Sequence, residues 1–354
     1  MKVNLLFSLI LMFFVIQCSD DHSARDGSHF KFKLKLDPAS QFMHVTLNMR
    51  LHPADPLPDT LNFSLHKQFT ILNLNGVGIQ DFHFAKNTEP TSVFMRDARP
   101  LTIILDKEID RNAGINIEFE YEGTITDWPK NSANVFTEDW VELGMYLPWF
   151  PTGFICGYFT YEIEAECDPD YQLRSYSGFT KSNGTWYFEQ NTPIFDVILV
   201  ASKQLKTMEQ RSGGTQVFFH YESLHDSTAK HLSEDLATVL GFYEEWFDGN
   251  KNNENITVIQ SPREHGGDYA RQGLMTLSRL TDEKYVVQHE DFVRNLGHES
   301  AHFWWNMAPT HNWEAWLNEG FAEYSILLVM KEMFGETVYQ KWIDNKDTEL
   351  VDIP

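Results

Sequence analysis

The feature that most constrains this chain is the pattern His-Glu-Ser-Ala-His at residues 298–302. In an α-helix, positions four apart lie about 40° from each other on one face, so His298 and His302 can reach a single metal ion. Glu299 is rotated by one further step, where its carboxylate can act as a general base on water. Five residues can match by chance, and two solvated histidines on an amphipathic helix are the alternative interpretation.

The residues around this pattern predict a helix, a short loop and a second helix. Apolar residues flank both histidines, and we expect Pro309 to end the first helix. The second helix ends near Gly335 and presents Glu319, with sixteen residues between it and His302. Two histidines, one glutamate and a position left for water form a catalytic zinc arrangement, which differs from a closed structural site.

The second helix contains Trp-Leu-Asn-Glu-Gly-Phe-Ala at residues 316–322. Together with the histidine pattern, this segment resembles the gluzincin metallopeptidases, specifically the membrane alanyl aminopeptidase family. The resemblance implies that His298, His302 and Glu319 bind one Zn²⁺ per chain and that Glu299 is the catalytic base. The connection between the two motifs is shorter here than is usual in the family, which changes the loop and leaves the ligand set in place.

Length and composition limit the partners of the chain. Its 354 residues, 42% of them hydrophobic, are enough for about two domains with buried cores. The net charge of −23 disfavours nucleic acid, whose phosphates would be repelled, and also disfavours a polybasic membrane patch. The family resemblance implies a peptide substrate.

The N-terminus has the pattern of an export signal. Residues 1–17 are predicted to be a signal peptide, because Val3–Ile16 is mostly apolar and short for a membrane span. The sequence Val-Ile-Gln-Cys, ending at Cys18, resembles a bacterial lipobox, so residues 18–29 are interpreted as a lipid-anchored tether. We expect an exported lipoprotein of the periplasm or cell surface that reaches the membrane through Cys18, with ordinary secretion as the alternative.

Two other cysteines, Cys156 and Cys167, remain in the chain. An exported protein can pair them in a disulfide, and two thiols buried in neighbouring strands are the alternative.

An N-terminal all-β domain of saddle-like or sandwich-like form is predicted for residues 30–205. Phe30–Leu36 alternates apolar residues with lysines, which is typical of a half-buried strand. Further strands are predicted at Val45–Leu51, Leu101–Leu105, Ile115–Tyr121, Tyr158–Glu164, Thr185–Phe188 and Phe195–Ala201. We expect no long helix before residue 227. In the family that the chain resembles, a β domain precedes the catalytic domain.

A thermolysin-like catalytic domain is predicted for residues 206–354, which makes the whole chain α+β. Lys206–Gly214 is interpreted as a polar connection, and a helix is expected to begin at Asp226 or Ser227. The strands predicted here are Val217–Tyr221, Ile256–Ile259 and Leu274–Ser278.

One motif departs from the family. Gly273–Leu277 stands where the family carries Gly-Ala-Met-Glu-Asn, and Thr276 occupies the position of the acidic residue that holds a free α-amino group. An aminopeptidase without this anchor and an endopeptidase without N-terminal selectivity both remain open. The strand can hold an extended peptide by backbone pairing or can be a plain core strand.

Glu323 lies four residues after Glu319, on the same helical face, and we expect it to orient one of the histidines. An exposed helical glutamate is the alternative.

The catalytic domain is expected to be incomplete at its C-terminus. The chain ends at Pro354, whereas the family's oxyanion-stabilising tyrosine lies well downstream of the zinc ligands. Neither Tyr324 nor Tyr339 has the spacing to replace it, and Trp342 and Ile343 are expected to lack packing partners. The expected activity is zinc-dependent, aminopeptidase-like hydrolysis of peptides outside the cytoplasm. The alternative is a non-catalytic surface protein that retains the fold and binds peptide or zinc.

Overall fold

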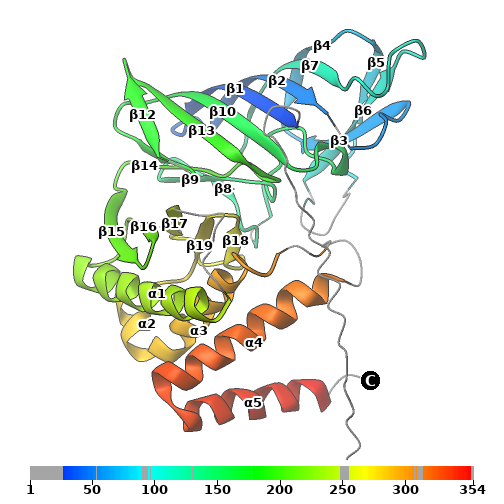
Figure 1. Ribbon diagram of the computed structural model, residues 1–354. Helices are drawn as coiled ribbons and strands as arrows, with labels where there is room; N and C mark the ends of the chain where they lie inside the picture. Colours follow the sequence, from blue (N-terminus) through cyan, green and yellow to red (C-terminus); the bar gives the residue numbers. More distant parts are fainter. Residues whose placement is uncertain are drawn as a thin grey trace, which may run out of the picture.

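Strands fill the first half of the chain and helices gather in the second half (Figure 1). The computed structural model describes residues 27–52, 54–89, 95, 97–129, 131–176, 178–247, 255–306, 308 and 314–351, with residues 345–351 described by their backbone alone. The predicted signal peptide of residues 1–17 and the predicted lipid attachment at Cys18 lie outside these residues. The predicted α+β class is confirmed.

The described residues from 28 to 202 form strands and one short 3₁₀ helix, so the expectation of no long helix in this part is confirmed. These elements are β1 (Ser28–Asp37), β2 (Phe42–Leu51), β3 (Thr60–His66), β4 (Thr70–Asn75), β5 (Ile79–Phe84), β6 (Ala98–Leu105), β7 (Ile115–Thr124), β8 (Val135–Phe136), β9 (Trp140–Leu143), η1 (Phe154–Cys156), β10 (Phe159–Cys167), β11 (Gln172–Arg174), β12 (Phe179–Ser182), β13 (Thr185–Ile194) and β14 (Leu199–Ser202). They form sheets in the orders β12-β13-β10-β1-β2-β7-β4, β11-β14-β9-β8 and β3-β6-β5.

Strand β1 shows how alternation in the sequence produces these sheets. Its phenylalanines and leucines are buried and its lysines are exposed, as predicted. It pairs antiparallel with β2 and parallel with β10, so it lies in the middle of the largest sheet. On the exposed face, Lys31 and Lys33 lie 3.0 Å and 3.7 Å from Glu162 and Glu164 of β10, and the opposite charges match across the two strands.

The described residues from 206 onwards form one sheet and a group of helices. The elements are β15 (Lys206–Ser212), β16 (Thr215–Tyr221), α1 (Asp226–Phe247), β17 (Asn255–Gln260), β18 (Tyr269–Arg271), β19 (Leu274–Leu277), α2 (Asp282–Val287), α3 (His289–Ala301), α4 (Ala315–Phe334) and α5 (Glu336–Val351). The sheet order is β15-β16-β17-β19-β18.

Several predicted boundaries are wrong. Lys206–Gly214 is not a connection, because β15 occupies most of it and pairs with β16 as an outer strand whose two faces are largely polar. Strands β3, β4 and β5 and helix α2 were not predicted. The strand predicted from Phe195 begins only at Leu199, and before it the Val197 carbonyl accepts a hydrogen bond from Trp149.

The five-stranded sheet is covered on both faces. Val258 and Met275 belong to the apolar cluster that includes residues of α1 and α3. Their neighbours Ile259 and Leu274, with Tyr269, belong to the core of the β-rich half. Successive side chains of a strand point to opposite faces, so this sheet joins the two halves of the molecule. Because the two halves share a core, the boundary predicted between residues 205 and 206 stays a prediction.

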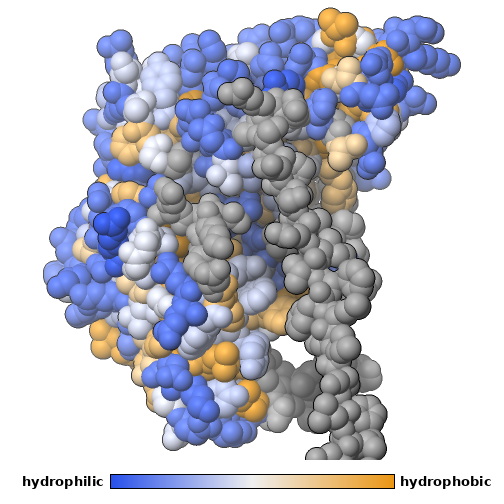
Figure 2. Space-filling view, viewed as in Figure 1, coloured by the Kyte–Doolittle hydropathy of each residue, from blue (hydrophilic) through white to orange (hydrophobic). Residues whose placement is uncertain are grey.

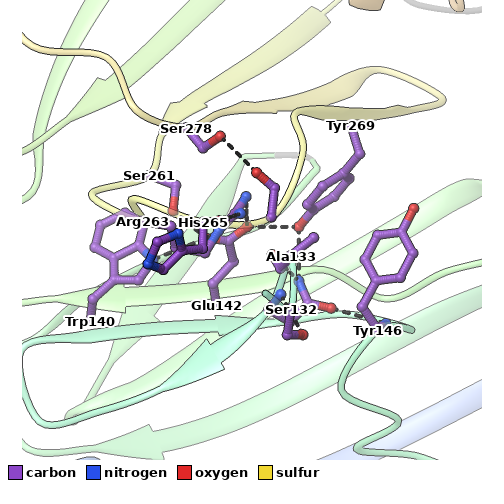
Figure 3. Close-up of polar contacts among 12 residues, drawn as sticks. Ser132, Ala133, Trp140, Glu142, Tyr146, Ser261, Arg263, His265, Tyr269 and Ser278 are labelled. Carbon is purple, nitrogen blue, oxygen red and sulfur yellow. Dashed lines mark hydrogen bonds and ion pairs between the residues drawn. The ribbon is translucent and has the colours of Figure 1, made fainter. Parts of the chain in front are cut away.

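A fully buried carboxylate also joins the two halves (Figure 3). Glu142 of β9 accepts hydrogen bonds from Arg263 Nε at 3.0 Å and Nη2 at 3.2 Å, one on each oxygen. Ser261, Tyr269 and Trp140 donate to the same carboxylate at 2.5, 3.0 and 3.1 Å. A charge that is costly to bury alone is therefore surrounded by donors, and β9 is tied to the segment that leads into β18.

Helices α3 and α4 cross at very short range. A side-chain carbon on Gly297 of α3 would overlap the buried side chain of Ile326 of α4. Tyr243 of α1 donates its hydroxyl to the Gly297 carbonyl at 3.0 Å. At the start of α4, the Asn318 amide accepts from the backbone N–H of Ala308 at 3.0 Å and donates to its carbonyl at 2.9 Å. These contacts set the position of α4 relative to α3.

The prediction that Pro309 ends the first of these helices is wrong, because α3 ends at Ala301. The backbone N–H groups of both Trp304 and Trp305 donate to the Ala301 carbonyl at 2.9 Å, which closes the helix in a tight turn. The predicted end of α4 at Gly335 is confirmed, and Gly335 adopts a φ of 86° there.

The outer surface of the visible face is mostly hydrophilic, in agreement with the net charge of −23 (Figure 2). Apolar side chains gather at its upper right, over the end formed by β4, β5 and β6. Among the described residues, none of the helices has the length and apolar character needed to cross a membrane.

Replacing Glu142 by Gln is expected to lower the free energy of unfolding by about 3–5 kcal/mol, because Arg263 would remain buried without its counter-charge. Urea denaturation followed by tryptophan fluorescence measures the change. Glu138→Gln is the matched control, since Glu138 pairs with Lys203 at 3.5 Å on the exposed surface. Equal midpoints for the two variants would contradict a structural role for the buried pair.

Alanine at Gly297 is expected to destabilise the protein relative to alanine at Gly241, a glycine of α1 where an added carbon would make only an ordinary contact with Ser212 Oγ at 3.9 Å. Both substitutions gain about 1 kcal/mol of helix propensity, so their difference isolates the crowding against Ile326. That overpacking costs about 1–3 kcal/mol. Thermal unfolding of the two variants tests this, and a Gly297→Ala protein as stable as Gly241→Ala would show that the helices can separate freely.

Candidate metal centre

The α3–α4 crossing brings three potential metal ligands together. One ligand atom from each of His298, His302 and Glu319 lies within 4.8 Å of the other two. Oε2 of Glu319 is 3.3 Å from His298 Nε2 and 3.8 Å from His302 Nε2. The two imidazole rings are perpendicular, with centroids 4.9 Å apart. The shorter connection inferred from the sequence therefore still places the glutamate beside both histidines.

The second nitrogen of each ring faces an oxygen. His302 Nδ1 is 3.1 Å from the carbonyl oxygen of Trp305, in the turn that closes α3. His298 Nδ1 is 3.2 Å from Glu323 Oε1, at ion-pair distance although without the alignment of a hydrogen bond. Metal-bound histidines usually carry a carbonyl or carboxylate on the ring nitrogen that does not bind the metal. The predicted position of Glu323 next to a histidine is confirmed.

The charges of these side chains depend on one another. Burial lowers the pKa of His298, but Glu319 and Glu323 outweigh it and raise this pKa to about 9. Burial raises the pKa of Glu323, but His298 and Arg294 outweigh it and lower that pKa to about 2. The hydrogen bond with His298 lowers the pKa of Glu319. A cation that displaced the proton of His298 would therefore meet ionised carboxylates.

Glu299 has a partly buried side chain next to the ligand cluster. Burial raises its pKa to about 7, with the His298 charge acting in the opposite direction and Asp268 adding to the increase. The charge of Arg271 lowers the pKa of Glu299. Asp268 and Arg271 come from β18 and the residue before it, so the outer strand of the sheet lies beside the candidate base.

Thr276 is a residue of β19, inside the five-stranded sheet. Its side chain is fully buried in β19, and its hydroxyl oxygen has no hydrogen-bond partner among the described residues. Strand β19 lies between β17 and β18 and pairs with both, so backbone pairing of a peptide with this strand is wrong and the core-strand alternative is confirmed. The strand at the end of the sheet on this side is β18.

The structure also tests the expectations about the packing of Trp342 and the pairing of Cys156 with Cys167. Trp342 of α5 has packing partners, because its ring belongs to the cluster around Ile326 and Val329 and lies under the Arg294 guanidinium at 4.8 Å. Cys156 and Cys167 are both free, so of the two alternatives the disulfide is wrong in this structure, and the thiols lie in η1 and at the end of β10 rather than in neighbouring strands. Burial raises the pKa of each thiol to about 12, which leaves them unreactive.

The sequence interpretation overlooked Arg294, although a signal for it was present. Arg294 is four residues before His298, so it shares the helical face of both histidines. No comparable signal exists for Asp268 and Arg271, because only the pairing of β18 with β19 brings them to this end of the sheet.

Known proteins resemble part of this chain in sequence. No protein-family model matches the chain. A segment of 147 residues, 40% of the chain, is 26% identical to endoplasmic reticulum aminopeptidase 2 from Bos taurus and 29% identical to the human protein. The matched segment spans 15% of the length of each relative.

Solved structures share the fold over most of the chain. The M1 zinc metallopeptidase from Deinococcus radiodurans superimposes with a TM-score of 0.69 at 16% identity, covering 93% of this chain and 75% of that one. A mutant M1 zinc metallopeptidase from the same organism, bound to a Tyr-Ser-Ala substrate, gives a TM-score of 0.67 with coverages of 93% and 76%. The chain therefore has the fold of these zinc metallopeptidases.

Proposed function

We propose that this protein is a zinc-dependent peptidase that hydrolyses peptide bonds with Glu299 as its general base. The observation that carries the proposal is the convergence of His298, His302 and Glu319 within 4.8 Å, with Glu299 adjacent on the same helix. The shared fold with zinc metallopeptidase structures supports it.

The ligand cluster fits zinc. Two imidazole nitrogens and one carboxylate oxygen are donors that zinc prefers, and three protein ligands leave a fourth position open. Atoms held at about 2.0–2.1 Å by one tetrahedral zinc lie about 3.4 Å apart, close to the separations of Glu319 from His298 and His302. The Glu319 side chain is 65% exposed, which leaves one side of the cluster accessible to a substrate. We expect one zinc ion per chain.

A zinc ion bound here would polarise the scissile carbonyl and make a water molecule more acidic. Glu299 accepts a proton from the water as the water oxygen attacks the carbonyl carbon. It then donates that proton to the leaving nitrogen as the C–N bond breaks. Glu323 and the Trp305 carbonyl hold the two histidine rings with their Nε2 atoms directed at Glu319.

Peptides are the proposed substrates, by analogy with the aminopeptidase relatives and the Tyr-Ser-Ala complex of the structural neighbour. An aminopeptidase needs a group that holds the substrate's free amine, and the Thr276 hydroxyl lacks the negative charge of an acidic residue for this purpose. The missing acidic residue favours endopeptidase action as the second candidate, with the extended substrate lying along β18. A non-catalytic protein that binds peptide or zinc is the remaining alternative.

The proposed location is outside the cytoplasm. A signal peptide over residues 1–17 and a lipid on Cys18 would place the protein at a membrane surface, or secretion would release it. The net charge of −23 supports the absence of a nucleic-acid partner.

Glu299→Gln is expected to abolish turnover while zinc stays bound, because the amide cannot accept the proton from water and Glu299 is not a ligand. The zinc-loaded protein is tested on matched peptides with free and acetylated N-termini, with bound zinc measured by atomic absorption. Glu319→Ala is the companion variant, and it is expected to lose zinc and activity together.

The outcomes of this experiment separate the alternatives. Cleavage of the free peptide alone indicates an aminopeptidase, and cleavage of both peptides indicates an endopeptidase. A wild-type protein with one zinc per chain and no more activity than Glu299→Gln would contradict catalysis and indicate a binding protein.

A further inference from the structure

We propose that Arg294 is a positioning residue for the metal centre and that it couples helix α5 to metal affinity. Arg294 holds Glu323 against His298 while resting on the ring of Trp342. This inference rests on the proposed function in one respect, since it takes zinc as the ion bound by His298.

Arg294 makes shorter contacts with Glu323 than His298 does. Its Nη2 atom lies 2.5 Å from Oε1 and 2.7 Å from Oε2 of the carboxylate, so one nitrogen contacts both oxygens. The contact of Glu323 with His298 Nδ1 is longer, at 3.2 Å, and lacks hydrogen-bond alignment. The guanidinium therefore determines where the carboxylate lies, and the ring of His298 is placed against a carboxylate that is already fixed.

The position of Arg294 is set by two helices. On α3 it lies one turn before His298, so a backbone of fixed geometry carries both side chains. From α5, Trp342 presents its ring to the guanidinium at 4.8 Å, a cation–π contact. The Arg294 side chain is 15% exposed, so it has little freedom to leave this position.

Without Arg294, Glu323 would be a carboxylate near a second one, Glu319, whose pKa its charge already raises. Like charges repel at this range, and a side chain that is 27% exposed can turn towards water. His298 would then lose the oxygen that orients its ring. Loss of an outer partner of a zinc-bound histidine typically weakens metal binding about 10–100-fold.

The test measures the zinc dissociation constant of the full chain by competition with a chromophoric chelator. Arg294→Met is expected to weaken zinc binding at least about tenfold. Arg294→Lys is expected to restore part of the affinity, because an ammonium can pair with Glu323 but lacks the planar face for Trp342. Lys341→Met is the matched control, since Lys341 lies 5.7 Å over the same ring but pairs with Glu290.

A double-mutant cycle separates positioning from a general structural role. If Arg294 acts through Glu323, adding Arg294→Met to Glu323→Gln changes the zinc affinity by much less than Arg294→Met does alone. The thermal shift produced by zinc should also shrink in Arg294→Met, beyond any change in the zinc-free melting temperature.

Zinc affinity of Arg294→Met within twofold of the wild type, or fully additive effects in the cycle, would overturn the inference. If Arg294→Met does not fold, Arg294→Lys and Trp342→Leu provide the same comparison, with a threefold or greater loss expected in Trp342→Leu. A wild-type protein that fails to bind zinc would contradict the proposed function itself, whereas zinc binding that is unchanged in these variants contradicts only this inference.

Discussion

The candidate site depends on the close crossing of α3 and α4. Metal ligands on two helices can share one ion only if the helix axes approach closely, and here Gly297 lets Ile326 occupy the space of a missing side chain. The same crossing places Glu319 opposite both histidines and Glu323 opposite His298. A single glycine without a side chain is therefore as important to the site as the residues that carry the chemistry.

Two buried ion pairs lie away from this crossing. Glu142 and Arg263 pair at the junction of the two halves, and Arg271 pairs with Asp196 at 3.1 Å close to the candidate base. Separating a buried charge from its partner is costly, so these pairs favour one relative arrangement of the β-rich half and the helices. The outer strand β18 is thereby held beside Glu299.

Much of the site was predictable because its residues are local in sequence. The spacing of the two histidines on a helix, the second helix with Glu319 and the place of Glu323 four residues later follow from helical periodicity. The strand alternation of β1, β2, β7 and β16 was predictable for the same reason, since one face of each strand is buried. Strand β15 escaped prediction because it lies at the end of its sheet, and α2 because it is only six residues long.

The sequence by itself determined which residues could bind a metal, which strands would alternate and that the class would be α+β. Only the tertiary structure decided that α3 ends at Ala301 and that Thr276 is fully buried. It also decided that Arg294 contacts both Glu323 and the ring of Trp342. The helical or strand periodicity of apolar residues depends only on residues close together in the chain, so it can be recognised from the sequence. The partner of a side chain across a helix crossing or a strand pair depends on how distant segments pack, which no local pattern specifies.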